Sequence, residues 1–488
     1  MKSQTLIAQA EQHYAPEQVS RLKAAIEIAS TAHAGQKRKS GEPYITHPLH
    51  VASILIEWRL DIDSVIAGVL HDVVEDTSVE LNQIEAKFGE DVAFLVDGVT
   101  KVGKVRSGMR DITEYRPETR ENLSKLLIAV GHDLRVVVIK LADRLHNLQT
   151  LKHLSPEKQH KIARESLDVF APLADRMGMG RVRVQIEELS FSYLEPNEYQ
   201  QLQQVIKKRV RQAHRNLETV RKAVESAFRS AGLLARIEGR VKSVYSLHKK
   251  LRKVDGDFDE IYDLIALRVL VNDTEACYRA LGLLHALYQP LPTRIKDYIS
   301  VPKPNGYQSL HTTVLTPEGQ VVEFQIRTDE MHLHAERGLA ASFHYNEQKL
   351  AKNYVRGEAA RVPRNMQWVV TLQEAIASLD SDSSAYERLR VDLFSDRIFT
   401  YSPKGDIYDL PEGATALDFA FAVHSDIGLH AHTIRVNQKI ATFNKVLQNG
   451  DIVEVLTQKR ARPHPDWVDF LRTDKARNKV RSYLHNKA

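Results

Sequence analysis

The sequence predicts a chain of several domains: an all-helical first part, an α/β second part and a small α+β module near the end. The length of 488 residues is typical of two to four domains. Up to about residue 195 apolar residues recur at helical spacing, and from about residue 235 strand-like alternation replaces that period. Between residues 391 and 457 short strands and turns surround one helix, ALDFAFAVH.

Each predicted element follows from a local pattern. Residues 197–230 form a long charged helical pattern that ends at Gly232. Later runs predict a strand in ARIEGR, a basic helix in SVYSLHKKL, a buried strand in IYDLIALRVLV and a hairpin in HTTVLTPEGQVVEFQIRT. The predicted boundaries are 1–195 for the helical domain, 196–345 for connector helices and the α/β domain, 346–390 for a helical linker, 391–457 for the small module and 458–488 for the start of a further helical region.

Composition and charge narrow the class of protein. A hydrophobic share of 43% is enough for packed cores, and the single cysteine, Cys277, excludes a disulfide framework and a cysteine-rich metal site. No apolar stretch reaches membrane-spanning length, and the N-terminus lacks the apolar segment of a secretory signal. A net charge of +5 is too small to predict nucleic-acid binding by itself. We therefore expect a cytoplasmic protein with no membrane partner.

Four side chains in the helical part form a candidate metal site. They are His47 in YITHP, His71 and Asp72 in HDVVEDT, and Asp143 in KLADRLHNL. Any one of them alone is more typical of a helix cap or a surface ion pair. Together they offer two imidazoles and two carboxylates, a mixed set that suits manganese, iron or zinc better than magnesium or calcium. The set predicts a metal-dependent phosphohydrolase.

The neighbours of these residues support that prediction. If HDVVEDT is one helix, Glu75 lies one turn after His71, and Asp76 lies one turn after Asp72. Two such acids can hold a water molecule and take its proton. Asn147 lies one turn after Asp143 and on the same helix face.

A second candidate site lies in the α/β part. Alternation in VVEFQIRT places Glu323, Gln325 and Arg327 on one face of a strand, and Asp263 begins the neighbouring strand. Two carboxylates on adjacent strands can hold Mg²⁺ against the phosphates of a nucleotide. Further polar residues stand at a strand-to-helix turn and in the loop PKPNGYQSLH: Arg240, Lys242, Ser246, Lys250, Asn305, Gly306, Tyr307 and His311. Each of these alone is more typical of a salt bridge or a turn.

In this order, the motifs resemble those of the long RelA/SpoT homologues, the bifunctional enzymes that make and degrade the alarmones ppGpp and pppGpp. QKRKSGEPYITHP, HDVVEDT and KLADRLHNL resemble the hydrolase domain. GRVKSVYSLHKKL, IYDLIALRV, PKPNGYQSLH and VEFQIRT resemble the synthetase domain, and YSPKGDIYDLPEGATALDFAFAVHSDIG resembles the TGS domain. The resemblance implies an all-α HD-type hydrolase domain, an α/β nucleotidyltransferase-like synthetase domain and a ubiquitin-like β-grasp TGS domain.

For the hydrolase domain the resemblance implies removal of the 3′-pyrophosphate of ppGpp or pppGpp with Mn²⁺. His47, His71, Asp72 and Asp143 would be the metal ligands. Glu75 and Asp76 would orient and activate the water. The substrate contacts would come from Arg38, Lys39, Ser40 and Asn147.

For the synthetase domain the resemblance implies transfer of the β,γ-pyrophosphate of ATP to the 3′-hydroxyl of GDP or GTP. Asp263 and Glu323 would serve Mg²⁺, and Tyr307 would stack on the guanine. The ATP phosphates would be held by Arg240, Lys242, Ser246 and Lys250, and the acceptor site would be completed by Lys296, Asn305, His311 and Gln325.

Two details bear on the type of family member. Bifunctional members carry an R-x-K-D motif, and this chain has one at residues 294–297. After the segment MHLHAERGLAA the family usually has His-Trp, whereas this chain has Ser342 and Phe343. Two alternatives therefore stay open: a hydrolase-dominant SpoT-like enzyme with a weak synthetase, and a mainly regulatory binding protein.

The resemblance also implies that the TGS module binds a macromolecular regulator in the stringent response. The partner would be the 3′ end of uncharged tRNA on a ribosome, or an acyl carrier protein. Leu429 stands where ribosome-bound members place a His, and His430 and His432 follow it. We expect this chain to lack the distal regulatory domains of the family, and hence to respond weakly or not at all to ribosomes with uncharged tRNA.

Overall fold

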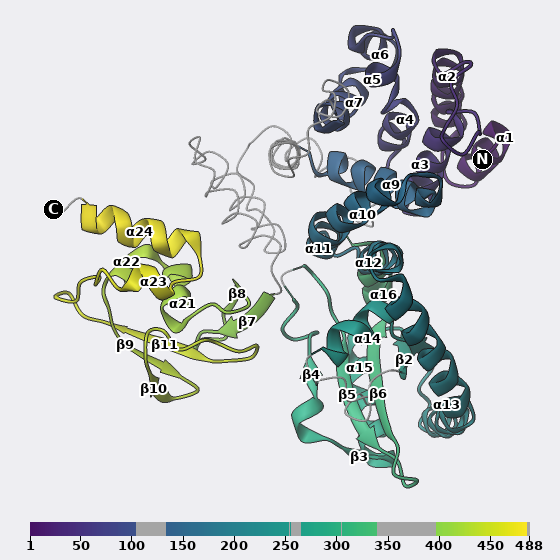
Figure 1. Ribbon diagram of the computed structural model, residues 1–488. Coiled ribbons are helices and arrows are strands. Elements are labelled where there is room, and N and C mark those ends of the chain that lie inside the picture. The colour runs from purple at the N-terminus through teal and green to yellow at the C-terminus, as the bar shows by residue number, and fades with distance from the viewer. Residues whose placement is uncertain (104–132, 253, 255–264, 304, 339–396, 486–488) are drawn as a thin grey trace. The chain divides into compact units, whose positions relative to one another are not determined.

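The computed structural model describes residues 1–103, 133–252, 254, 265–303, 305–338 and 397–485 (Figure 1). Internal contacts divide the chain into two units, residues 1–373 and 374–488. The predicted linker 346–390 lies outside the described residues, as do Asp263, Ser342 and Phe343.

The first unit begins with a helical part. Its described elements are α1 (Ser3–Glu11), α2 (Pro16–Ala32), α3 (Thr46–Glu57), α4 (Ile62–Leu70), α5 (Val73–Asp76), α6 (Leu81–Phe88), α7 (Glu90–Gly103), α9 (Leu134–Gln149), η2 (Leu151–His153), α10 (Pro156–Glu165), the π-helical turn η3 (Ser166–Phe170), α11 (Ala171–Arg176) and α12 (Gly180–Leu194). Caps fix the helices that carry the candidate site: Asp61 accepts from the backbone N–H of Ser64 at the start of α4, and Asp133 accepts from that of Arg135 at the start of α9. α3, α4, α7 and α9 pack on one another through buried aliphatic side chains.

The prediction of one continuous helix through HDVVEDT is wrong. The chain leaves the helix at His71 and Asp72, between α4 and the single turn α5. The His71 imidazole turns back to the carbonyl oxygen of Gly68, with 2.9 Å between Nδ1 and O. In a regular helix the adjacent side chains of His71 and Asp72 would point about 100° apart. At the break both side chains lie beside His47 or Asp143.

The second part of this unit is a mixed sheet with helices. Its elements are α13 (Pro196–Ser230), β1 (Arg236–Val241), α14 (Val244–Leu251), β2 (Ile265–Val271), α15 (Thr274–Leu287), β3 (Gln289–Pro290), η4 (Pro292–Arg294), β4 (Lys296–Asp297), β5 (Leu310–Leu315), β6 (Val321–Thr328) and α16 (Asp329–Arg337). The strand order is β1-β2-β6-β5-β3, with β4 paired to β5. β2 and β6 run parallel and the other pairs are antiparallel, so the predicted mixed sheet is confirmed.

The two faces of this sheet differ in polarity. Leu267, Val269, Phe324 and Ile326 are buried in a core that includes Cys277 of α15. On the other face the register aligns polar residues across five strands: Glu238, Arg268, Gln325, His311 and Lys296. This polar row positions the second candidate site.

The helical part and the sheet part touch at backbone groups of α11 and the loop after it. The carbonyl of Asp175 in α11 accepts a hydrogen bond from the Asn305 side chain at 3.0 Å. Gly338, which follows α16, lies so close to the loop after α11 that a Cβ there would stand 2.1 Å from the carbonyl oxygen of Met177. A Cβ on Gly178 would stand 2.9 Å from the carbonyl oxygen of Asn305. Only glycine permits this approach.

The second unit is an α+β module. Its elements are β7 (Arg397–Tyr401), β8 (Ile407–Pro411), α21 (Ala416–Val423), α22 (Ser425–Leu429), β9 (Ala431–Val436), β10 (Lys439–Ala441), β11 (Val453–Thr457), α23 (Trp467–Phe470) and α24 (Asp474–His485). The expectation of one helix within 391–457 is corrected to two, because the His424 side chain caps a second short helix, α22. Asp418 is fully buried and accepts from the backbone N–H groups of Arg472 and Thr473, which ties the C-terminal helices to the module.

The predicted sequence of all-α, α/β and α+β parts is confirmed. Within the described residues, every helix falls short of the length or apolar character needed to cross a membrane.

Candidate metal centre and nucleotide site

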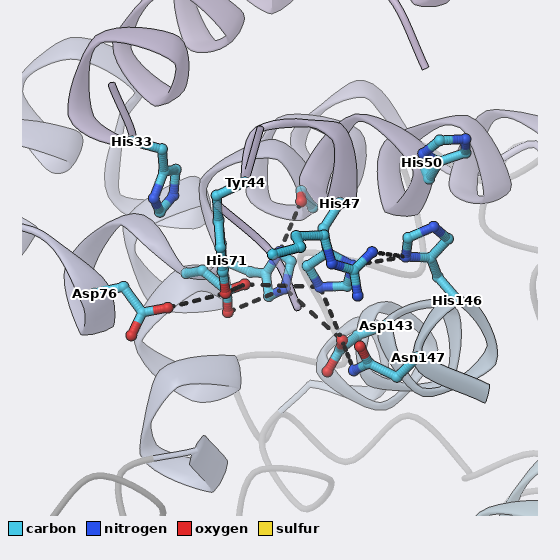
Figure 2. Close-up of polar contacts among 12 residues, drawn as sticks. His33, Tyr44, His47, His50, His71, Asp76, Asp143, His146 and Asn147 are labelled. Carbon is cyan, nitrogen blue, oxygen red and sulfur yellow. Dashed lines mark hydrogen bonds and ion pairs between the residues drawn. The ribbon is translucent and has the colours of Figure 1, made fainter. Parts of the chain in front are cut away.

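Three separated segments of the helical part meet at one buried point (Figure 2). His47 comes from the first turn of α3, His71 from the break after α4, and Asp143 from the middle of α9. Each offers one ligand atom, and these atoms lie within 4.8 Å of one another. Asp72 joins them: its carboxylate oxygens lie 3.2 Å from His71 Nε2 and 3.7 Å from His47 Nε2. The structure thus brings all four predicted ligands together.

The donor set fits a divalent cation. His71 Nδ1 donates its proton to the carbonyl oxygen of Gly68, so Nε2 keeps its lone pair. That Nε2 atom is buried without a hydrogen-bond partner. A lone pair that faces carboxylate oxygens of Asp72 at 3.2 Å and Asp143 at 4.0 Å is unfavourable unless a cation lies between them. Nitrogen and oxygen ligands in this number suit a transition metal.

The carboxylates of the cluster are held ionised. Burial opposes the charge of Asp143, but the Lys140 ammonium favours it, and the pKa of Asp143 lies well below the ordinary value. Lys140 Nζ lies 2.8 Å from one oxygen of Asp143, and the Asn147 amide donates to the other at 2.6 Å. Burial likewise opposes the charge of Asp72, yet its pKa is lowered, with Lys140 among the groups that favour the charged form.

The two acids beyond the break have different surroundings. The Tyr44 hydroxyl lies 2.8 Å from Asp72 Oδ2 and 2.9 Å from Asp76 Oδ2, so these two carboxylates share one donor. Burial, helped by Asp72 and Asp76, raises the pKa of the half-buried Glu75. A carboxylate with a raised pKa beside a metal site suits proton transfer.

The predicted substrate residues Arg38, Lys39 and Ser40 lie on the turn between α2 and α3. The Arg38 backbone N–H bonds to the carbonyl of Glu42, and Gly41 has a φ of +86°, so the turn is closed and tight. Lys39 is exposed and Ser40 half-buried. The Arg38 guanidinium reaches back to α9, with Nη2 donating to Thr150 Oγ1 at 3.2 Å.

Sequence reasoning missed two residues of this site, Tyr44 and His146. His146 Nδ1 lies 2.7 Å from His47 Nδ1. Burial, together with His47 and Arg38, lowers the pKa of His146 to about 2. His146 lies in KLADRLHNL and Tyr44 in the segment before His47, but no spacing rule indicates which distant side chain each would meet.

The polar sheet face gathers most of the predicted synthetase residues. Arg240 donates to Gln325 Oε1 at 2.7 Å, and Gln325 donates to Glu323 Oε1 at 2.9 Å. Around the Glu323 carboxylate, Lys242 Nζ lies 3.9 Å and His311 Nδ1 3.8 Å away. His311 Nε2 in turn lies 2.9 Å from the Tyr307 hydroxyl.

The other predicted residues surround this row. Ser246 and Lys250 lie on α14 one turn apart, and the Ser246 hydroxyl accepts from Ser243 at 2.7 Å. Lys296 is exposed on β4 and pairs in register with His311. Asn305 bonds to the helical part, as described above.

Three cations that sequence reasoning gave no role also lie here: Arg268, Arg327 and Lys303. Nε of Arg268 and Nε of Arg327 are buried without hydrogen-bond partners. Burial and the neighbouring guanidinium groups lower the pKa of Arg327 to about 10, and burial with nearby cations lowers that of His311 to about 3. Arg268 interrupts the apolar run IALRVLV, a signal that could have been used. This density of positive charge suits a polyphosphate.

Comparisons with known proteins match three regions of the chain and most of its length. The HD domain family model matches residues 25–180, the model of the region found in RelA/SpoT proteins matches 239–350, and the TGS domain model matches 397–457. The chain is 42% identical over 463 residues to a GTP pyrophosphokinase of Myxococcus xanthus, which covers 95% of this chain and 60% of that protein. It is 42% identical over 476 residues to the bifunctional (p)ppGpp synthase/hydrolase SpoT of Escherichia coli, with 97% and 66% covered.

Among solved structures, a metazoan ortholog of SpoT is 29% identical, with 30% of this chain and 84% of that chain covered at a TM-score of 0.24. The chain spans slightly less than two thirds of the length of the two full-length relatives above.

Proposed function

Because the chain belongs to the RelA/SpoT family, we propose that it is a bifunctional alarmone enzyme of the stringent response. One activity is that of a guanosine-3′,5′-bis(diphosphate) 3′-pyrophosphohydrolase, which converts ppGpp or pppGpp to GDP or GTP and pyrophosphate. The other is that of a GTP pyrophosphokinase, which transfers pyrophosphate from ATP to the 3′-hydroxyl of GDP or GTP. We place the enzyme in the cytoplasm.

The observation that carries the hydrolase is the buried meeting of His47, His71, Asp72 and Asp143. We assign Mn²⁺ to it because two nitrogen and two oxygen ligands suit a transition metal. When bound, such an ion supplies Lewis-acid polarisation of a phosphoryl oxygen and lowers the pKa of a water.

The chain's own residues complete the hydrolytic step. Glu75, whose pKa is raised, takes the proton of the attacking water, and Asp76 orients that water beside it. Asn147 is held by Asp143 and positions the ribose side of the substrate. Arg38 and Lys39, with Ser40, hold the phosphates at the mouth of the site.

The synthetase uses the polar sheet face. Glu323, with Asp263, would hold Mg²⁺ and activate the 3′-hydroxyl of the acceptor. The ATP phosphates are held by Arg240, Lys242, Ser246 and Lys250. The Tyr307 ring stacks on the guanine, and Lys296, Asn305, His311 and Gln325 complete the acceptor site.

We further propose that the TGS module binds a regulator and does no chemistry. An open pocket there is lined by Asp426, Ile427, His430, Thr457, Gln458 and Lys459. Leu429 packs against the core of the module, whereas His432 is exposed beside the pocket residue His430. A tRNA 3′ end or an acyl carrier protein is the partner we assign to this surface.

Two incubations of the purified chain test the enzyme. One contains ppGpp with Mn²⁺, and the other ATP and GDP with Mg²⁺, with the nucleotides separated by anion-exchange chromatography. We expect GDP and pyrophosphate from the first and ppGpp and AMP from the second. A chain that hydrolyses ppGpp but makes none would favour the hydrolase-dominant alternative, and a chain inactive in both would leave only a regulatory binding role.

A further inference from the structure

His47 uses both nitrogens of its ring. Nε2 faces the cluster, 3.2 Å from an oxygen of Asp143. Nδ1 points the other way and lies 2.7 Å from Nδ1 of His146 (Figure 2). The two atoms are close enough for a hydrogen bond, so one ring must donate and the other must accept.

The direction of that bond follows from the chemistry on both sides. A His47 that binds a cation through Nε2 keeps its lone pair there and carries its proton on Nδ1. His146 Nδ1 must then accept. The guanidinium of Arg38 approaches the same atom, with 3.4 Å between Nη1 and Nδ1, and a guanidinium can only donate. Both neighbours therefore require a lone pair on His146 Nδ1.

Packing fixes the ring that provides this lone pair. His146 is 4% exposed and lies on α9, one turn from Asp143. Its ring stacks on His47 at a centroid distance of 4.9 Å and on His50 at 4.7 Å. Arg38 makes its second bond to Thr150, the C-cap residue that follows α9. The helix α9 thus carries the proposed ligand Asp143 and His146, which accepts from the second ligand His47. The C-cap residue Thr150 supports Arg38.

We propose that His146 is a positioning residue that fixes His47 in its cation-binding tautomer and orients Arg38 toward the substrate. This rests on the proposed hydrolase, in which His47 is a ligand and Arg38 a phosphate contact. Partners of this kind on metal-binding histidines typically change metal affinity by about 10- to 100-fold when they are removed.

The test compares two amides at position 146. In His146→Asn the amide oxygen lies as many bonds from the backbone as Nδ1 and can accept from His47. In His146→Gln the oxygen lies one bond further, at the place of Nε2, and cannot reach His47 without moving the helix. His50→Gln is the matched control, because His50 stacks on the other side of His146 and does not contact the cluster.

The measurement is Mn²⁺ affinity by electron paramagnetic resonance, with thermal unfolding to confirm that each variant is folded. We expect His146→Gln to weaken Mn²⁺ binding by about 10- to 100-fold, and His146→Asn and the control to stay within about threefold of wild type. At saturating Mn²⁺, His146→Gln should still show a raised KM for ppGpp, because Arg38 has lost its acceptor.

The outcomes separate this inference from the proposed function. Equal Mn²⁺ affinity in His146→Gln and wild type would overturn the inference, as would equal weakening in both amide variants. The Mn²⁺ titration contains no nucleotide, so its result does not depend on whether the chain hydrolyses ppGpp. One further outcome would support the inference and refute the hydrolase. In it, the wild type binds Mn²⁺ and His146→Asn and His146→Gln differ as expected, yet the wild type leaves ppGpp intact.

Discussion

The two candidate sites of the first unit are built with opposite charge. In the helical part, imidazole and carboxylate lone pairs converge on one buried point. On the sheet, cations predominate: Arg268 and Arg327 lie 3.6 and 3.7 Å from the Glu336 carboxylate, and Arg240 donates to Gln325. In the function proposed above, the first site holds a metal ion against a phosphate, and the second holds a polyphosphate directly. We therefore expect that neutralising a charged side chain in one site abolishes the reaction of that site and leaves the other reaction intact.

The largest effect is expected from Asp72→Asn. The change keeps the shape of the side chain but removes a charged ligand from the buried cluster. We expect hydrolysis of ppGpp to fall by roughly 10³-fold or more, about 4 kcal/mol of transition-state stabilisation, with Mn²⁺ binding weakened and synthesis retained. Hydrolysis at the wild-type rate would show that the ligand assignment is wrong.

Glu75→Gln is the contrast within the same site. Glu75 is assigned to the water and not to the cation, so turnover should fall while Mn²⁺ affinity stays close to that of wild type. Loss of bound Mn²⁺ in Glu75→Gln would contradict this division of roles.

Glu323→Gln is the corresponding change on the sheet. It removes the carboxylate that Lys242 and His311 surround and leaves the side-chain shape. We expect pyrophosphate transfer to become undetectable and ppGpp hydrolysis to continue, both measured chromatographically. Glu318→Gln is the control, because Glu318 is exposed at the turn of the same hairpin. Transfer that survives in Glu323→Gln would remove Glu323 from the reaction.

Gly338→Ala tests the contact between the two regions and touches neither set of polar side chains. A Cβ there would lie 2.1 Å from the carbonyl oxygen of Met177, so one backbone must move. We expect a loss of stability of about 2–4 kcal/mol, seen as a lower apparent Tm. Gly319→Ala shares the positive φ but meets nothing within 4 Å, so it should cost only about 1 kcal/mol. Equal losses would mean that the close approach contributes nothing.

A smaller effect is expected from Tyr307→Ala. The Tyr307 ring lies at the edge of the row, with its hydroxyl on His311 and Lys303 Nζ 5.3 Å from its centroid. Removing a stacking face should raise the KM for GDP about tenfold, since base–aromatic stacking contributes about 1–3 kcal/mol. Tyr307→Phe keeps the ring and should stay near wild type. An unchanged KM in the alanine variant would argue against stacking.

How much of each site the sequence predicts differs for a physical reason. Alternation along VVEFQIRT places Glu323 and Gln325 on one face correctly, because the strand period is strictly two. The helical period fails at His71 and Asp72, because the helix breaks there and the His71 side chain bonds to the carbonyl oxygen of Gly68. Partners such as His146 for His47 lie 99 residues apart, and only tertiary packing determines that pairing.

The two regions also touch, and the contact suggests how one site affects the other. From the sequence we expected the helix 197–230 to connect them, and α13 does span Pro196–Ser230. The structure offers a shorter route. Arg144, next to Asp143, pairs with Glu165 at 3.0 Å and lies over the Phe170 ring at 4.2 Å. Phe170 leads into α11, whose Asp175 carbonyl accepts from Asn305 beside the acceptor site.

The smallest expected effect is the coupling through this route. We expect GDP with a non-hydrolysable ATP analogue to weaken ppGpp binding at the hydrolase by about 5- to 10-fold, within the range usual for linked sites. Calorimetry in the Glu75→Gln background, where turnover is slow, gives both affinities. Linkage requires ppGpp to weaken the binding of GDP and the analogue by the same factor. Gly178→Ala should reduce the factor toward one, because its Cβ would push against the carbonyl of Asn305. Affinities that do not depend on the other site's occupancy would show that the contact is only structural.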